Sequence, residues 1–288
     1  MKEYTLKWDR FELKLGSKPC IMGILNVTPD SFSDGGKYYN FEKAVTRAKE
    51  LVNQGADILD IGGESSRPNA KPVSEAEEIK RVIPVIKAIS SQIDIPVSID
   101  TVKSEVAKLA IDAGASIIND ISSFENDPKL ADLAAKRGVL VIMMHMKGTP
   151  ETMQDNPEYI DLITEINNYF IKRVDYAVAR GIKKENIILD PGIGFGKTIQ
   201  HNLVILKNIN ILAKLGYPLL IGSSRKSFIQ KILEEMNKKK IDAASKECEI
   251  GTLASVAAVF MNGGHIVRVH DVARVKPFVQ ILDSIKSA

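Results

Sequence analysis

Short runs rich in Ile, Val and Leu recur along this chain, and stretches of helical character separate them. Each run is apolar almost throughout, which is typical of strands covered on both faces, as in parallel sheets. Regular alternation of such strands with helices predicts βα units around a parallel sheet. The eight runs are CIMGIL (20–25), DILDIG (57–62), VSID (97–100), SIIND (116–120), VLVIMMH (139–145), NIILD (186–190), LLIG (219–222) and HIVRV (265–269).

The segments between the runs carry helix signals. The segment 74–90 opens with Ser and an acidic first turn, which favours a helix start. The segment 156–181 ends at a glycine, the residue type that most often follows a helix. We expect helices at 41–56, 74–90, 101–115, 127–138, 156–181 and 201–216.

Two architectures can hold eight βα units: a closed (β/α)8 barrel and a doubly wound open sheet. The strand count and the polar residues at the strand ends favour the barrel, because its strand ends all converge on one mouth. Residues 4–15 differ, since they alternate apolar and polar side chains and predict a β-hairpin within 1–17. We therefore predict an α/β fold: a single (β/α)8 TIM barrel domain of residues 1–288, with the hairpin covering its N-terminal end.

Charge and composition restrict the possible partners. The chain has 288 residues and a net charge of +3, which is too balanced to indicate nucleic acid or an anionic membrane. No apolar run approaches the roughly 20 residues that span a bilayer, and the N-terminus has no apolar signal core. Cys20 and Cys248 lie far apart, which favours buried, reduced thiols. We expect a cytoplasmic protein that binds small molecules, with the basic stretch 238–240 as solvated surface between the last two strands.

Polar side chains follow nearly every predicted strand, at the end where a barrel carries its active site. One such residue is often a simple cap or turn residue, but a mouth lined by carboxylates, amides and cations suits a polar substrate. The residues are Asn26, Glu64, Ser66, Arg67, Asp100, Asn119, Asp120, His145, Asp190, Arg225, Lys226, Arg268, His270 and Asp271.

Cations mark one half of this mouth. Arg67 follows the second strand, while Arg268 and His270 alternate along the eighth strand and point to the same side. Arginine binds phosphate oxygens through paired hydrogen bonds, and Ser66 can add a donor. These residues predict an anion site that suits a diphosphate. A salt bridge at the barrel rim is the alternative for Arg268.

Carboxylates and an amide mark the other half. Asp100, Asn119 and Asp190 end the third, fourth and sixth strands, where they can pair with the edge of a planar heterocycle such as an aminopyrimidinone. Lys226 can donate to a carbonyl or nitrogen of the ring. A plain turn for Asp190 and an exposed loop for Lys226 are the alternatives. The stretch PGIGFGKT (191–198) lacks Walker spacing, so we expect a sharp turn with Phe195 as an apolar wall.

Taken in order, the motifs resemble those of one family. Between Met22 and Val272 the chain reads MGILNVTPDSFSDGG, DIGGESSRP, VSIDT, IINDIS, LDPGIGFGK, GSSRKSF and RVHDV. This set resembles the dihydropteroate synthases of folate biosynthesis over essentially all of the chain after the hairpin. The resemblance implies a (β/α)8 barrel, commonly a homodimer. It also implies condensation of 6-hydroxymethyl-7,8-dihydropterin diphosphate with p-aminobenzoate to give 7,8-dihydropteroate and pyrophosphate.

The resemblance further implies a role for each matching residue. The implied pterin-binding residues are Asp100, Asn119, Met144, Asp190, Gly222 and Lys226. Those implied for the diphosphate are Asn26, Ser66, Arg67, Arg268 and His270, and Asn26 also binds Mg²⁺. Those implied for p-aminobenzoate are Phe32, Phe195, Lys226 and Ser227. The expected catalytic residues are Asn26, Arg67, Asp100, Asp190, Lys226, Arg268 and His270, with the loops 28–36 and 64–70 closing over the site.

The second motif departs from the family pattern, which usually has Thr before the Arg and Gly after the Pro. Here the chain has Ser66 and Asn69. Serine keeps the hydroxyl donor, and asparagine adopts a left-handed backbone less freely than glycine. We expect the reaction to be a dissociative, SN1-like substitution. Cations and Mg²⁺ would stabilise the leaving diphosphate before the arylamine attacks.

Other classes stay open on the residues alone. A pterin-binding methyltransferase domain of the corrinoid type shares the pterin carboxylates but has no use for the diphosphate residues. A Schiff-base aldolase would use Lys226 as its nucleophile. A metal-dependent barrel hydrolase needs several His ligands, and the 4 histidines of this chain lack such spacing. A non-catalytic pterin-binding protein would lose the cations of the mouth, which favours the synthase.

Overall fold

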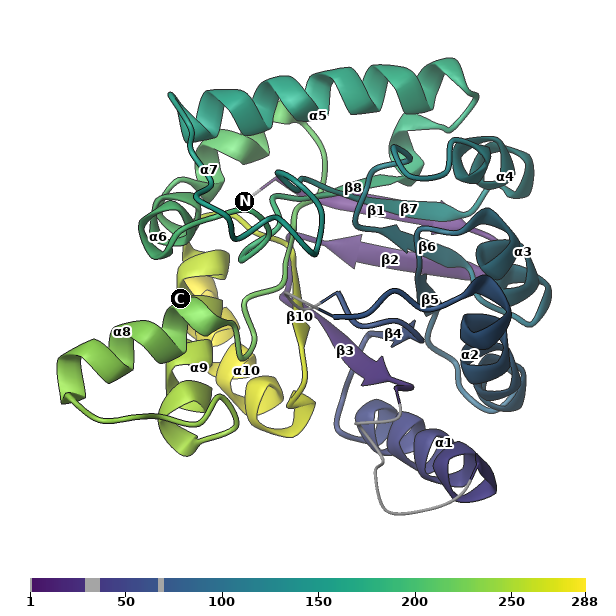
Figure 1. The fold of residues 1–288 in the computed structure, drawn as a ribbon, viewed down its shortest axis with the longest axis horizontal. Coiled ribbons are helices and arrows are strands. Elements are labelled where there is room, and N and C mark those ends of the chain that lie inside the picture. Colours follow the sequence, from purple (N-terminus) through teal and green to yellow (C-terminus); the bar gives the residue numbers. More distant parts are fainter. Residues whose placement is uncertain (1, 29–36, 67–69) are drawn as a thin grey trace.

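The computed structural model describes residues 2–28, 37–66 and 70–288. Within these residues eight strands pair in parallel, in the order β8-β7-β6-β5-β4-β3-β10-β9 (Figure 1). A parallel bridge between Leu189 and Leu219 joins the two end strands and closes the barrel. This confirms the predicted (β/α)8 barrel over the open sheet. The strands are β3 (Cys20–Asn26), β4 (Ile58–Gly62), β5 (Val97–Asp100), β6 (Ile117–Asp120), β7 (Leu140–Met144), β8 (Ile187–Asp190), β9 (Leu220–Ile221) and β10 (Ile266–Val269).

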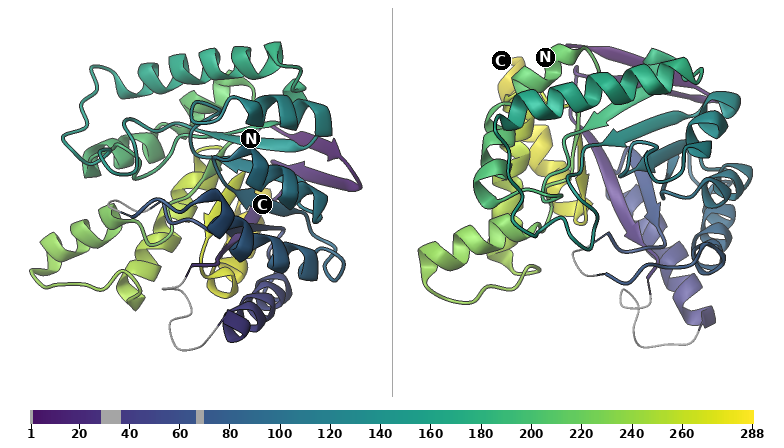
Figure 2. Two further views of the ribbon diagram at one scale, coloured as in Figure 1. Left: turned by 45° about the vertical axis from the view of Figure 1, so that its right-hand side comes forward. Right: turned by 45° about the horizontal axis from the view of Figure 1, so that its top comes forward.

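Helices surround the strands (Figures 1 and 2). Outward side chains of the strands, such as Ile21 and Leu59, share one apolar core with helix residues such as Leu51 and Ile86. The helices are α1 (Lys37–Asn53), α2 (Glu75–Ile89), α3 (Ser104–Asp112), α4 (Lys129–Arg137), α5 (Leu162–Ala179), α6 (Ile199–Lys207), α7 (Ile209–Leu212), α8 (Ser227–Asn237), α9 (Lys246–Met261) and α10 (Val272–Ser287), with 3-10 turns at Lys184–Asn186 and Ala213–Leu215. None in the described part of the chain is long and apolar enough to cross a membrane.

Some helix boundaries differ from the expectation. Helix α5 begins at Leu162 rather than near 156, because the Asp161 carboxylate accepts the Thr164 N–H at 3.1 Å and caps the first turn. The expected helix 201–216 is broken at Asn208, whose side chain donates to a carbonyl of α6. Helices α8, α9 and α10 lie outside the six predicted helix ranges, although a (β/α)8 barrel requires helices after its last strands. The basic stretch 238–240 follows α8 and is exposed, as predicted.

The interior of the barrel has an apolar floor. It consists of inward side chains of the strands: Met22, Ile58, Ile117, Leu140, Ile142, Ile188, Leu220 and Ile266. The antiparallel hairpin of β1 (Tyr4–Trp8) and β2 (Phe11–Leu15) adds Leu6, Trp8 and Leu15 to the same cluster. The hairpin therefore covers the N-terminal end of the barrel, as predicted.

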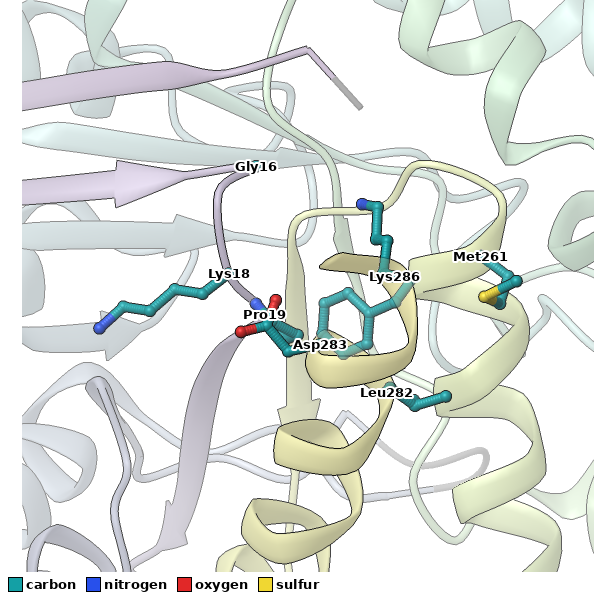
Figure 3. A pocket seen from close by; sticks show the side chains of 8 residues that line it. Gly16, Lys18, Pro19, Met261, Leu282, Asp283 and Lys286 are labelled. Atoms are coloured by element: carbon teal, nitrogen blue, oxygen red, sulfur yellow. The ribbon is translucent and has the colours of Figure 1, made fainter. Parts of the chain in front are cut away.

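A hollow of about 10 Å³ lies between the β2–β3 connection and the ends of α9 and α10 (Figure 3). Lys18 and Pro19 border it just before β3, and Met261 and Lys286 border it from the helices. A space of this size holds about one water molecule. It also lies at the N-terminal side of the barrel, away from the strand ends where barrel enzymes act. The substrate site is therefore expected at the opposite end.

Candidate active site

Above the apolar floor, the inward positions of the strands become polar. In the sheet register Asp60 lies beside Ser98, and Asp100 lies beside Asn119. Side chains alternate along a strand, so Asp60 points inward like Ile58 two residues earlier. The polar layer formed in this way consists of Asp60, Ser98, Asp100, Asn119, Asp190 and Arg268.

Arg268 is the centre of this layer. Its Nε donates to Asp60 Oδ2 at 2.6 Å, and its Nη2 donates to Asp100 Oδ2 at 2.7 Å. Asn119 Nδ2 donates to the same oxygen of Asp60 at 3.1 Å. The sequence prediction missed Asp60, which lies inside its strand rather than at the end. The alternation of inward residues in DILDIG is the signal that identifies it.

Burial shifts the pKa values of the ionisable side chains in the site. It raises the pKa of Asp100 to about 7, against the opposing charge of Arg268. It also raises the pKa of Asp190 to about 6, although the Gly192 N–H donates to Asp190 Oδ1 at 2.8 Å. Burial alone lowers the pKa of Arg268, but the carboxylates of Asp60 and Asp100 outweigh it and raise that pKa. The site thus combines a permanent cation with carboxylates that titrate near neutral pH.

The glycine-rich loop 191–196 passes beneath Lys226. The Nζ of Lys226 lies 4.0 Å from the centre of the Phe195 ring. Phe195 is buried together with Met144 and Met153. At Gly194, where φ is +84°, a Cβ would lie 3.2 Å from the Lys226 side chain, so a larger residue would crowd it. The loop therefore turns sharply and supplies an apolar wall, as expected.

A buried lysine that sequence reasoning did not single out holds this loop. Lys197 Nζ lies 3.0 Å from His145 Nδ1 and donates to the Phe195 carbonyl at 2.8 Å. Burial lowers the pKa of Lys197 to about 7 and that of His145 to about 2. His145, one of the polar strand ends, is therefore a neutral partner of Lys197.

The remaining side of the mouth holds Asn26 and His270. Asn26 ends β3 and pairs in register with Gly62. A Cβ on Gly62 would lie 3.6 Å from Asp100 Oδ2 and 3.8 Å from Asn26 Oδ1, so these two oxygens flank the same point. The Nδ1 of His270 lies 3.1 Å from Ser224 Oγ, which orients the imidazole just beyond β10.

Other predicted residues are placed with less contact. Gly222 lies beside Arg268, since its Cβ would be 3.8 Å from the Arg268 Cβ. Ser66 is half-buried, and Ser227 is exposed at the start of α8. Phe32 and Arg67 lie outside the described residues. Fold and site together define the class: a (β/α)8-barrel enzyme whose mouth combines carboxylates and an amide with an arginine, a lysine and a histidine.

Comparison with known proteins identifies the family. A family model described as pterin binding enzyme matches residues 22–270. The dihydropteroate synthase of Synechocystis sp. is 45% identical over 270 residues, which cover 94% of this chain and 91% of that protein. The structure of Yersinia pestis dihydropteroate synthase with a sulfonamide drug complex has a TM-score of 0.91 at 42% identity, covering 99% of this chain and 100% of that one. That of Xanthomonas albilineans dihydropteroate synthase in complex with 7,8-dihydropteroate has a TM-score of 0.83 at 36% identity, covering 96% and 97%.

The chain belongs to the dihydropteroate synthase family of pterin-binding enzymes, and it is a transferase. Family membership decides among the classes that the residues alone left open, and it selects the synthase over the methyltransferase, aldolase, hydrolase and non-catalytic alternatives.

Proposed function

We propose that this protein condenses 6-hydroxymethyl-7,8-dihydropterin diphosphate with p-aminobenzoate, giving 7,8-dihydropteroate and pyrophosphate. The observation that carries the proposal is the polar layer, in which Arg268 lies between the carboxylates of Asp60 and Asp100 at the barrel mouth. Family members bind a sulfonamide drug and 7,8-dihydropteroate, which supports an arylamine and a pterin as substrates.

The carboxylate half suits the pterin. Asp100 and Asn119 lie in register on the neighbouring strands β5 and β6, and Asp190 ends β8, so the mouth offers acceptors and an amide donor to the ring edge. Buried Met144 supplies apolar surface for the ring face. Lys226 can donate to a ring carbonyl or nitrogen, and Gly222 leaves space beside Arg268. These residues would orient the pterin with its methylene carbon toward the cationic half.

The cationic half suits the diphosphate, through Arg268, His270 and Ser66, with Arg67 assigned by the family resemblance. We propose Mg²⁺ at Asn26. This residue offers a carboxamide oxygen beside Asp100 Oδ2, and Mg²⁺ prefers oxygen ligands and often takes one or two from protein while substrate phosphates and water fill the rest. Asp100 Oδ2 accepts from Arg268, so the carboxamide oxygen of Asn26 is the protein ligand that would hold the ion, with the diphosphate supplying further oxygens. A bound Mg²⁺ would supply positive charge against the charge that develops on the leaving diphosphate.

The geometry supports a dissociative substitution. The bond between the pterin methylene carbon and the diphosphate oxygen breaks, and Arg268 and His270 stabilise the departing anion. Ionised Asp100 and Asp190 hold the ring N–H groups and favour the positive charge that the conjugated ring shares. The amine of p-aminobenzoate then attacks the carbon, and its proton passes to the released pyrophosphate or to water. Phe195, Lys226 and Ser227, with Phe32 from the family resemblance, would line the p-aminobenzoate site.

We also propose a homodimer. Ile250 and Met261 of α9 and Ile281 and Ile285 of α10 are exposed by 62–66%. Exposed apolar side chains on two helices that pack against each other support self-association. Light scattering should give twice the monomer mass, and Ile281→Asp should lower that mass toward one chain. A wild-type mass equal to that of one chain would contradict the proposal.

A cytoplasmic location and a single domain complete the proposal. Both Cys20 and Cys248 are buried and unpaired, as a reducing compartment would favour. The barrel and its hairpin share apolar contacts through Leu6, Trp8 and Leu15, which supports one cooperative unit over 1–288.

The test of the function is identification of the product. The purified protein is incubated with both substrates and Mg²⁺, and mass spectrometry should detect 7,8-dihydropteroate. Omission of either substrate should abolish it. Asp100→Asn serves as the matched variant, because it keeps the side-chain shape but removes the carboxylate, and should reduce the rate. Absence of 7,8-dihydropteroate from the complete wild-type reaction would refute the proposed function.

A further inference from the structure

An ion cluster outside the polar layer lies at the connections that follow β4 and β5. Lys103, three residues after Asp100, donates from Nζ to Glu64 Oε2 at 2.6 Å, Glu78 Oε2 at 2.5 Å and the Val73 carbonyl at 2.8 Å. An ammonium group has three N–H donors, so Lys103 uses all of them here. Glu78 is fully buried on α2, which gives the cluster a fixed base.

The cluster joins the two ends of one segment. Glu64 lies two residues before Ser66, and its second oxygen, Oε1, accepts the Val73 N–H at 2.9 Å. Glu64 and Val73 are therefore linked both directly and through Lys103. The segment 64–73 begins and ends at this link, and the structure describes 64–66 and 70–73 of it.

A further contact fixes the start of the segment. Arg81 of α2 donates from Nη1 to the Gly63 carbonyl at 2.8 Å and from Nε to Glu77 at 3.1 Å. The backbone at Gly63 is pressed against α2, since a Cβ there would lie 2.7 Å from Val82. The residue just before Glu64 is thus held to a rigid helix.

We propose that Glu64 and Lys103 are positioning residues, which hold the start of the 64–73 segment so that Ser66 meets the diphosphate of the substrate. The inference rests on the proposed function, because the proposed function assigns the diphosphate to this side of the mouth. Small errors in position greatly reduce the benefit of a prearranged contact. Asp100 ends β5 and Lys103 lies three residues later, directly before α3, so a short connection joins the cluster to the pterin half of the mouth.

A role in stability alone predicts a different result. In that case loss of the Glu64 contacts would weaken the binding of all ligands equally, or would leave the binding of all of them unchanged. A positioning role affects only the ligand that carries the diphosphate. Comparison of two ligands, 6-hydroxymethyl-7,8-dihydropterin and its diphosphate, separates these cases, because both occupy the pterin half and only one reaches Ser66.

The experiment measures the dissociation constants of both ligands by calorimetry, with Mg²⁺ present. Glu64→Ala should lower the preference for the diphosphate over the alcohol by about tenfold, with the alcohol bound as in the wild type. Glu64→Gln keeps an acceptor for the Val73 N–H and should therefore lower the preference for the diphosphate less than Glu64→Ala does. Glu105→Ala, which removes the exposed pair with Lys108 on α3, is the control and should retain the wild-type preference.

Thermal melting checks that each variant is folded, and Glu64→Gln carries the test if Glu64→Ala does not fold. An unchanged preference in the folded variants would overturn the inference, and so would equal weakening of both ligands. If the wild type itself showed no preference for the diphosphate, the proposed function would fail as well. The measurement on the wild type therefore distinguishes failure of the inference from failure of the proposed function.

Discussion

At the scale of single residues, the site depends on one arginine held by two carboxylates. Arg268 and Asp100 could be predicted from their places at strand ends, whereas Asp60 could not be found by that rule. The alternative for Arg268 was a salt bridge at the rim. Its ion pairs are instead inside the barrel, since its side chain is 20% exposed and that of Asp60 is fully buried. The pairing of Lys197 with His145 was also beyond prediction, because no spacing rule links the ends of β7 and the loop after β8.

The first prediction concerns Asp190. Asp190→Asn should weaken binding of 6-hydroxymethylpterin by about tenfold or more, because a buried acceptor of ring N–H groups loses its charge. With a pKa of about 6 for Asp190, wild-type affinity should fall as the pH is lowered through that value and the carboxylate gains a proton. The variant should lack this step and keep only the titration of Asp100 at about 7.

Calorimetry over a range of pH measures this effect, and a ligand without phosphate avoids the ionisation of the diphosphate. The same pH dependence in the wild type and in Asp190→Asn would exclude Asp190 from the pterin site.

At the scale of elements, strands and most helices followed from periodicity, while loops and helix starts depended on particular side chains. The apolar runs located the strands because both of their faces are buried. The start of α5 was misplaced, since the cap at Asp161 competes with helix signals further upstream. The composition of the glycine-rich loop predicts a turn. It does not predict how closely the backbone of the loop approaches the end of β7.

The second prediction compares two glycines with similar φ angles. Gly192 has φ of +68°, and a Cβ there would lie 2.1 Å from the His145 carbonyl oxygen. Gly138 has φ of +64°, with nothing within 4 Å of a Cβ. Gly138→Ala should cost about 1 kcal/mol of unfolding free energy from backbone strain alone. Gly192→Ala should cost about 2–4 kcal/mol and reduce turnover, because it also displaces the loop that carries Phe195.

Urea unfolding and steady-state assays of the two variants measure these effects. Equal losses of stability, or full activity in Gly192→Ala, would show that the close contact at His145 does not position the loop.

At the scale of the whole molecule, the barrel separates stability from chemistry. Its N-terminal end is filled by apolar side chains and covered by the hairpin, whereas its C-terminal end carries the polar layer. This division could be predicted, because parallel strands place all their ends on one side. The cluster of Lys103, Glu64 and Glu78 could not, since its members come from the connections after β4 and β5 and from α2, and no spacing in the sequence shows that their side chains meet.

The third prediction follows from this division. Leu15, at the end of the hairpin, is 1% exposed beneath the barrel floor. Leu15→Ala should lower the unfolding free energy by about 2–5 kcal/mol through loss of apolar contact and a residual cavity. Leu13→Ala, on the same strand but only partly buried, should cost about 1 kcal/mol. Below their melting temperatures both variants should keep the wild-type kcat and KM, and a changed KM in Leu15→Ala would contradict the separation.

Pyrophosphate release tests the central claim most directly, namely that the polar layer transfers a pterin from diphosphate to an arylamine. With saturating pterin diphosphate and Mg²⁺, the wild type should release one pyrophosphate for each 7,8-dihydropteroate formed, and continued release at the full rate should require p-aminobenzoate. Arg268→Ala should slow this release by about 100-fold or more. Release at the same rate without p-aminobenzoate, or normal release from Arg268→Ala, would contradict the account.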